Sequence, residues 1–158
     1  MPELRDALED AGFGDVRTYV QSGNVVLSTR ASPKTVARMC EQAIAERFGL
    51  DIAVIVRTSD ELAEIVRRNP LKKVATNPKR YQVSFLAADP EPAVLPKLEA
   101  AAAPEERVVL VGRELYAWHP DGIGRSRLWA QLAGKGLGVA ATARNWTTVT
   151  KLLELASE

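Results

Sequence analysis

The order of the hydrophobic patterns in the first 69 residues is the feature that most constrains the fold. These patterns switch between the 3.6-residue period of helices and the two-residue period of strands. In chain order they predict a helix at residues 4–11, strands at 16–20 and 25–29, a helix at 33–48 and a strand at 52–56. This order is that of a ferredoxin-like split βαβ unit whose first strand is missing.

The missing strand has a consequence for the sheet. In the ferredoxin-like topology that strand would lie inside the sheet, between residues 52–56 and residues 25–29. We therefore expect residues 52–56 to pair directly with residues 25–29 or with a strand of another chain. An open sheet edge also favours association, so a homo-oligomer is an expected arrangement.

Residues 70–80 separate this part from the rest of the chain. Two prolines and three lysines occur there with little periodicity, which predicts a linker. Beyond it the patterns predict a strand at 81–86, a helix at 91–103, strands at 107–111 and 114–118, a helix at 126–133 and a last helix after Thr142. We expect an α+β protein with a first subdomain at 1–69 and a second at 81–158, which is a small antiparallel sheet with helices.

Local signals predict where several elements end. Ser32 and Pro33 are a helix cap and a first-turn proline, and Gly49 stops the same helix. Thr58 and Glu61 have the spacing of a capping box at the start of another helix. The pair at 112–113, Gly followed by Arg, predicts a two-residue hairpin turn between the strands at 107–111 and 114–118.

The composition excludes several classes of protein. One Cys and one His in 158 residues rule out an intramolecular disulfide framework and a four-ligand structural zinc site. No segment matches a P-loop, a dinucleotide fingerprint, a metalloprotease helix or an EF-hand, so we expect neither a metal nor another cofactor. No apolar run is long enough to span a membrane, so we expect a cytoplasmic protein with no membrane partner.

Few side chains indicate chemistry by themselves. His119 lies at the end of a predicted strand, and a lone histidine in such a place is typically a turn residue. Cys40 lies on the apolar face of its helix, as a small buried hydrophobic residue does. Glu105 and Glu106 precede a strand, and we interpret them as solvated charge.

The cations are unevenly distributed, although the formal net charge is only +1. Residues 65–88 contain six Lys or Arg, residues 122–153 contain five, and neither stretch contains an acid, so 11 of the 21 cations lie in two acid-free stretches. Predicted helices in the second stretch begin near Ser126 and Thr142, beside Arg125 and Arg144. Helix N-termini and guanidinium groups both favour phosphate and carboxylate groups. We expect a site for a small anion in the second subdomain.

Three segments resemble the signature motifs of a known family. They are residues 19–26 (YVQSGNVV), 120–126 (PDGIGRS) and 142–149 (TARNWTTV). The family is a bacterial one, the domain of unknown function 1697, and the likeness covers essentially the whole chain. The resemblance implies a two-part α+β fold with a ferredoxin-like first part, and no established activity, cofactor or catalytic residue.

The chain departs from that family at its start. Members usually open with a hydrophobic strand and an Arg-Gly-Ile-Asn-Val-Gly-Gly-type loop, whereas this sequence begins at the helix that follows. This suggests that Met1 is an internal methionine taken as a start. The difference agrees with the missing strand inferred above.

Polar residues of the three motifs are our candidates for ligand contacts. Some of them have no evident role in a turn, a cap or a core. The candidates are Gln21, Ser22, Asn24, Arg125, Ser126, Arg144 and Asn145.

Two other functions stay open. A metal-independent enzyme acting on a phosphorylated metabolite would use Ser126, Asp121 or His119 for proton transfer. A nucleic-acid-binding protein would use the basic stretch at residues 67–80, with Tyr81 nearby for base stacking. The nucleic-acid hypothesis is less favoured, since the pI is only 7.9 and no recognised nucleic-acid module is present.

Overall fold

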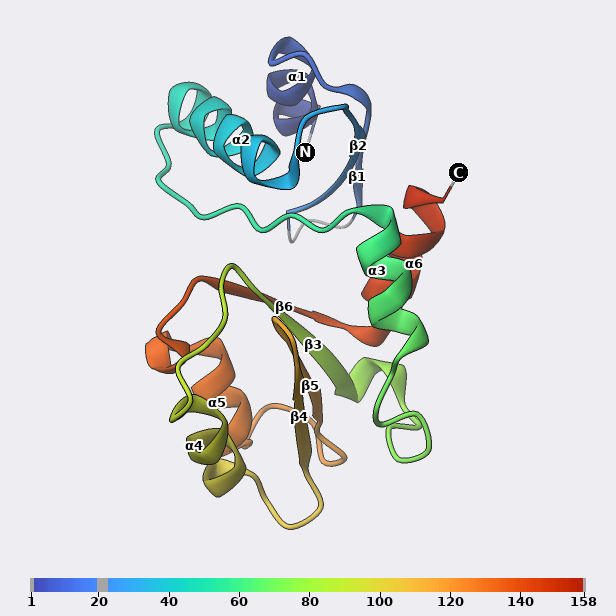
Figure 1. Ribbon diagram of the computed structural model, residues 1–158, viewed down its shortest axis with the longest axis vertical. Helices are drawn as coiled ribbons and strands as arrows, with labels where there is room; N and C mark the ends of the chain where they lie inside the picture. Colours follow the sequence, from blue (N-terminus) through green and yellow to red (C-terminus); the bar gives the residue numbers. More distant parts are fainter. Residues whose placement is uncertain (1, 20–22, 158) are drawn as a thin grey trace. The chain divides into compact units, whose positions relative to one another are not determined.

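The structure is a computed structural model in which residues 2–19 and 23–157 are described (Figure 1). It is an α+β fold, as expected, with two antiparallel sheets. Contacts divide the chain into two compact units, Met1–Leu62 with Lys151–Glu158, and Ala63–Thr150. We refer to these as unit 1 and unit 2. The domain boundaries expected at residues 69 and 81 stay a prediction.

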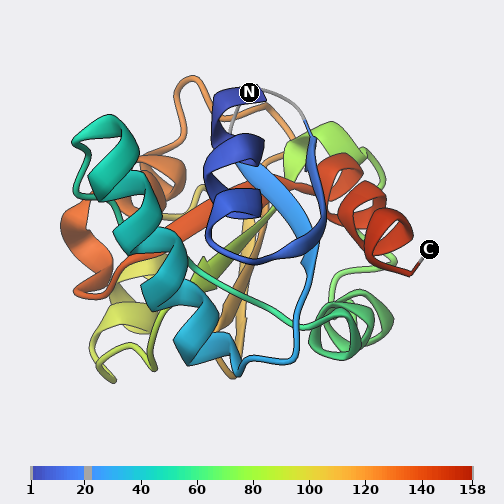
Figure 2. The ribbon, with the colours of Figure 1, turned by 90° about the horizontal axis from the view of Figure 1, so that it is seen from above.

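The described residues of unit 1 up to Phe48 form two helices and a two-stranded hairpin. These elements are α1 (Pro2–Asp10), β1 (Gly14–Tyr19), β2 (Asn24–Ser28) and α2 (Pro33–Phe48). α1 packs against both α2 and β1 (Figures 1 and 2). The buried members of the core between them are Leu8, Phe13, Val16, Val36 and Cys40.

The ends of α2 confirm the local signals in the sequence. The hydroxyl of Ser32 accepts a hydrogen bond from the N–H of Thr35 at 3.3 Å, and Pro33 is the first helical residue. Gly49 ends the helix with φ of 67°, a conformation that glycine adopts without steric cost.

The strand expected at residues 52–56 is wrong, because residues 49–58 form no helix or strand. β2 pairs with β1 alone among the described residues, so the expected pairing with residues 25–29 is also wrong. Val54 and Val56 still pack against the core of unit 1. The N–H of Val54 donates to the Glu41 carboxylate at 2.9 Å, so a side chain supplies the bond that a neighbouring strand would have made.

Two finer expectations for unit 1 stay predictions. One is the ferredoxin-like topology, because the two paired strands in the described part of residues 1–69 are too few to establish it. The other is pairing of residues 52–56 with another chain.

Unit 2 contains a four-stranded antiparallel sheet with two helices on one face. The strands are β3 (Tyr81–Leu86), β4 (Arg107–Val111), β5 (Glu114–Trp118) and β6 (Ala141–Asn145), in the order β4-β5-β3-β6. α4 (Val94–Ala101) and α5 (Arg127–Ala133) lie side by side on that face (Figure 1). The buried members of this core are Leu86, Val94, Leu98, Leu115, Ala117, Leu128, Leu132 and Leu137. Short 3₁₀ turns, η1 (Pro78–Arg80) and η2 (Lys135–Leu137), precede β3 and β6.

The helix expected after Thr142 begins later than predicted. Residues 141–145 form β6, which pairs with β3, and α6 (Trp146–Ala156) follows. Oδ1 of Asn145 accepts a hydrogen bond from the N–H of Thr148 at 2.9 Å, so Asn145 caps this helix. Thr142 is therefore a strand residue and not a helix start.

α3 (Ser59–Arg67) begins with the predicted capping box, in which the N–H of Thr58 donates to Glu61 at 2.8 Å and the N–H of Glu61 donates to Thr58 at 3.1 Å. The residue after its last turn, Arg68, is bonded to the sheet of unit 2. Nε of Arg68 donates to the Tyr116 hydroxyl at 3.0 Å, and the guanidinium also pairs with Glu114. None of the described helices is long and apolar enough to cross a membrane.

Candidate functional site

The register of the sheet in unit 2 assigns its side chains to two faces. Opposed residues of antiparallel strands share a face, and residues alternate along each strand. Leu115 and Ala117 belong to the core under α4 and α5. Gln82 opposes Ala117 on one side and Asn145 on the other, so both of these polar residues lie on the helix-covered face. This face is therefore apolar under α4 and α5 and polar at the end of the sheet where Gln82 and Asn145 lie.

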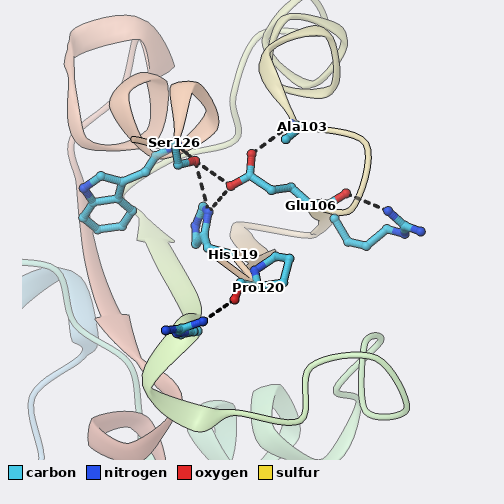
Figure 3. Close-up of polar contacts among 8 residues, drawn as sticks. Ala103, Glu106, His119, Pro120 and Ser126 are labelled. Carbon is cyan, nitrogen blue, oxygen red and sulfur yellow. Dashed lines mark hydrogen bonds and ion pairs between the residues drawn. The ribbon is translucent and has the colours of Figure 1, made fainter. Parts of the chain in front are cut away.

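The polar side chains of Glu106, His119 and Ser126 form a cluster at this end of the sheet (Figure 3). Oε2 of Glu106 lies 2.7 Å from Nδ1 of His119 and accepts a hydrogen bond from the Ser126 hydroxyl at 2.6 Å. Oε1 of Glu106 accepts from the N–H of Ala103 at 2.9 Å. The carboxylate lies between Ala103 on one side and Ser126 with His119 on the other, as Figure 3 shows. Because Glu106 precedes β4, His119 follows β5 and Ser126 precedes α5, the cluster ties these elements together.

The register explains why Glu106 meets His119. Arg107 opposes Trp118 in the pairing of β4 with β5, so Glu106 and His119 are the next opposed positions. Both are buried, with exposed fractions of 8% and 0%. The interpretation of Glu106 as solvated charge is therefore wrong, and His119 is a buried residue.

The cluster also determines the charge of Glu106. Burial raises the pKa of this carboxyl, but hydrogen bonds from the Ala103 N–H, Ser126 and His119 outweigh burial and leave the pKa below its usual value. Glu106 is therefore a buried carboxylate whose two oxygens both accept hydrogen bonds.

The cluster has the residue types of a catalytic triad but not its arrangement. In a triad, one imidazole nitrogen faces the carboxylate and the other faces the hydroxyl. Here Glu106 and Ser126 both face Nδ1 of His119, with Oγ of Ser126 at 3.3 Å from that nitrogen. Oγ of Ser126 also accepts from the N–H of Trp129 at 3.0 Å as the cap of α5. Because the hydroxyl proton is donated to Glu106, the cluster positions a loop and does not activate a nucleophile.

The loop held by this cluster is associated with two arginines. Arg125 lies in the loop, directly before Ser126. Arg80 lies in η1, and its guanidinium donates to the carbonyl oxygen of Pro120 in the same loop. The N–H of His119 donates to the carbonyl oxygen of Arg80 at 3.0 Å. Both arginines are exposed, so two guanidinium groups from separate elements are available at this loop.

Arg144 lies on the opposite face of the sheet from Ser126. It opposes Val83, which alternates with the helix-facing Gln82 and Ser84 along β3. Its guanidinium donates to the Thr142 hydroxyl at 2.5 Å and to the carbonyl oxygen of Ala143 at 2.8 Å, and burial lowers its pKa. The structure does not bring Arg144 together with Ser126, and a role for Arg144 in ligand binding stays a prediction.

The remaining candidates have different placements. Asn145 is on the same face as the cluster, with Oδ1 engaged as a helix cap. Asn24 belongs to unit 1, where it is buried and donates from Nδ2 to the carbonyl oxygen of Tyr19 at 3.1 Å. Gln21 and Ser22 lie outside the described residues. Across residues 2–19 and 23–157, no group of three His, Cys, Asp or Glu side chains could hold a metal ion.

Sequence reasoning did not place Glu106, Gln82 or Arg80 at this end of the sheet. For Glu106 a signal was present, because counting outward from the hairpin turn at 112–113 pairs position 106 with position 119. For Gln82 and Arg80 the sequence carries no such signal, since their neighbours come from distant segments that pair only in the folded sheet.

The model of a family described as "Protein of unknown function (DUF1697)" matches residues 1–116. The chain belongs to this family. The resemblance carried by the three motifs is confirmed, although the second and third motifs lie beyond the DUF1697 match. The description of the family supplies no activity to transfer.

A solved structure extends the likeness to almost all of the chain. The conserved bacterial protein SP0830 from Streptococcus pneumoniae is similar over 99% of this chain and 88% of its own, with a TM-score of 0.75 and 16% sequence identity. At that identity the likeness establishes a shared fold alone. No curated protein matches the chain.

Proposed function

We propose that the protein binds a small ligand carrying a phosphate or carboxylate group at the end of the sheet in unit 2. Arg80 and Arg125 are the cations that contact the anionic group. The observation that carries the proposal is the loop between β5 and α5, which bears Arg125, bonds Arg80 through Pro120 and is anchored by buried Glu106.

The chemistry of the two side chains supports this proposal. A guanidinium group donates paired hydrogen bonds that match the oxygens of phosphate and carboxylate. A loop that is already held in place loses little conformational freedom when a ligand binds, so less binding energy is spent on ordering it. The amide Nδ2 of Asn145 lies on the same face of the sheet and adds a neutral donor.

An enzyme of the kind considered from the sequence is supported less well. His119 has no exposed surface, and the hydroxyl of Ser126 is engaged by Glu106 and by the N–H of Trp129. Of the three groups considered for proton transfer, Asp121 alone is exposed. One exposed carboxylate without a positioned partner gives little basis for acid–base catalysis.

Nucleic-acid binding through residues 67–80 is also supported less well. Arg67 pairs with Glu64, and Arg68 pairs with Glu114. These two cations are already neutralised by carboxylates within the protein, which reduces the number that can displace counterions from a phosphate backbone.

Isothermal titration calorimetry with inorganic phosphate and with citrate tests the anion site. We expect both anions to bind the wild type. In the double variant Arg80→Ala, Arg125→Ala the affinity should fall at least tenfold, because each substitution removes charge-assisted hydrogen bonds worth about 1.5–3 kcal/mol. Arg38→Ala is the matched control, because Arg38 is an exposed arginine on α2 of unit 1. The proposal is wrong if neither anion binds the wild type, or if the double variant binds as well as the control.

A further inference from the structure

β4 is an edge strand of the sheet in unit 2. The strand order is β4-β5-β3-β6, so among the described strands β4 has β5 as its one neighbour. Its sequence is RVVLV, in which the four aliphatic residues at 108–111 are half-buried and the charged residue, Arg107, stands at one end. A regular, apolar edge strand is a template for a further strand, because its outward N–H and C=O groups have no ladder partner.

The hydrogen bonds of the neighbouring strand show which residues of β4 face outward. The N–H of Leu86 at the end of β3 donates to the carbonyl oxygen of Arg113 at 2.9 Å. Since Arg113 directly precedes β5, the odd-numbered positions of β5 bond to β3 and the even-numbered positions bond to β4. Val109 opposes Tyr116, so Val109 is bonded to β5 and the residues on either side of it face outward.

The outward backbone groups of β4 are those of Val108 and Leu110. Their N–H and C=O groups make no hydrogen bond within residues 2–19 and 23–157. The register of β4 with β5 runs without a bulge, and residues 108–111 contain neither a proline nor a charge. Bulges, prolines and charges are what usually keep edge strands from pairing, so β4 lacks this protection.

The other edge of the same sheet, β6, is protected. The N–H of Ala87 donates to the carbonyl oxygen of Ala140 at 2.8 Å, so the even-numbered positions of β6 bond to β3 and Ala143 faces outward. The guanidinium group of Arg144 donates to the carbonyl oxygen of Ala143 at 2.8 Å. A charged side chain of β6 thus satisfies an outward backbone group, which no side chain does for β4 in the described part of the chain.

Two copies of β4 are complementary to each other. In an antiparallel pair centred on Val109, Val108 of one copy opposes Leu110 of the other, so the outward residues meet as hydrogen-bonded pairs. There are two such pairs, and each exchanges two backbone hydrogen bonds. A register shifted by two residues would leave one outward residue of each copy beyond the end of the other strand.

The charges at the ends of the strand agree with the register centred on Val109. Arg107 opposes Val111 of the second copy, so the two arginines are not brought together. Two positions further out, Glu105 of one copy is in register with Arg113 of the other, and this happens at both ends of the pair. Glu105 is exposed and Arg113 is partly exposed. Opposite charges therefore meet at each end, which favours a second copy of this chain as the partner.

We propose that the protein forms a two-fold symmetric dimer in which β4 pairs with β4 of a second copy, joining two four-stranded sheets into one of eight strands. Val108 and Leu110 pack against the core under α4 and α5, so Val109 lies on the opposite face of the sheet. The two Val109 residues face each other at the symmetry axis, with about 4.5 Å between their Cα atoms. A contact of one strand is small, so the dimer dissociates on dilution.

Sedimentation velocity over a concentration series tests this dimer. We expect the wild type to change from monomer to dimer as the concentration rises. Val109→Lys and Val109→Glu each place two like charges against each other at the symmetry axis, so each raises the dissociation constant at least about tenfold. An equimolar mixture of the two variants recovers the dimer, because opposite charges then face each other. Ala141→Lys, at an exposed position of β6, is the matched control and dimerises as the wild type does.

Hydrogen exchange followed by NMR tests the same contact without a substitution. The amides of Val108 and Leu110 face outward, so we expect their exchange to slow at least about tenfold between dilute and concentrated wild-type protein. The amide of Val109 is the internal control, because it is bonded to β5 and is protected at every concentration.

Three results would overturn the proposal. The first is a wild type that stays monomeric throughout the concentration series. The second is a dimer that neither charged variant weakens, or a mixture of variants that are folded by circular dichroism and do not dimerise. The third is exchange at Val108 and Leu110 that does not depend on concentration, and this result decides the question even if the variants do not fold.

Discussion

Glu106 and His119 occupy opposed positions just beyond the paired ends of β4 and β5, with Oε2 of Glu106 lying 2.7 Å from Nδ1 of His119. The same oxygen accepts from Ser126, which begins the capped turn of α5. One buried carboxylate thus joins two strands to a helix and fixes the loop that bears Arg125. The loop is ordered by charge-assisted hydrogen bonds, which are stronger than neutral ones.

Replacing Glu106 by Gln is expected to destabilise the protein by about 2–3 kcal/mol at pH 7, because charge-assisted hydrogen bonds to a buried carboxylate are lost. The pKa of Glu106 in the folded protein is below its usual value. The stabilisation of the fold by ionised Glu106 is therefore complete above the usual pKa of about 4.5 and is lost as the pH falls through the lower pKa of the folded protein. Urea denaturation from pH 7 to pH 3 should show the difference between wild type and variant shrinking with acid.

Glu105→Gln is the control for this experiment, since Glu105 is the exposed neighbour in the sequence. We expect it to change stability by less than about 0.5 kcal/mol at every pH. A deficit in Glu106→Gln that is the same at pH 7 and at pH 3 would contradict the assignment of Glu106 as a buried carboxylate.

Replacing Asn145 by Ala is expected to lower the stability of the protein by about 1 kcal/mol, because Oδ1 caps α6 through the N–H of Thr148. Asn145→Asp retains an oxygen in the same place and adds a negative charge at the helix N-terminus, so it should be at least as stable as the wild type. Thermal denaturation of both variants measures the difference. If the Asp variant loses as much stability as the Ala variant, the capping hydrogen bond is not the source of the stability that Asn145 provides.

The predictions that were confirmed depend on neighbours in the sequence. Ser32, Pro33 and Gly49 end a helix through contacts within one turn, and the capping box of Thr58 and Glu61 is equally local. Such signals are present in the sequence whatever the rest of the chain does.

The predictions that were wrong depend on distant partners. Residues 52–56 have the composition of a strand, but a strand needs a partner, and the Val54 N–H is bonded to a glutamate side chain instead. Residues 141–145 form β6 because β3 lies beside them. Glu106 is the same type of residue as its neighbour Glu105 but is buried, and the hairpin register determines this difference.

Cys40 is expected to be unreactive in the folded protein. Burial, with a smaller effect of neighbouring Glu41, raises the pKa of its thiol from 9.0 to about 11. A rise of this size lowers the thiolate fraction about 100-fold near pH 8, and the thiolate is the reactive form. Reaction with a disulfide reagent such as DTNB should be at least about 100-fold slower in buffer than in urea. Rapid labelling of the folded protein would show that the thiol is accessible.

We expect the ion pair between Arg68 and Glu114 to contribute more to the stability of the folded protein than the exposed pair between Arg67 and Glu64. Glu114 is buried, and Arg68 also donates to the Tyr116 hydroxyl at 3.0 Å. A double-mutant cycle with Arg68→Met and Glu114→Gln should give a coupling energy of about 1–3 kcal/mol, since either single change leaves the other group in the protein without its partner.

The matched control for this cycle is the exposed pair of Arg67 with Glu64, which are three residues apart on α3. Arg67→Met and Glu64→Gln should couple much more weakly, because water screens the charges and holding the side chains together costs entropy. Urea denaturation of the two cycles in the same buffer gives both values. Equal coupling in the two cycles would mean that the burial of Glu114 does not strengthen its pair, and that the anchoring of α3 to the sheet depends on packing.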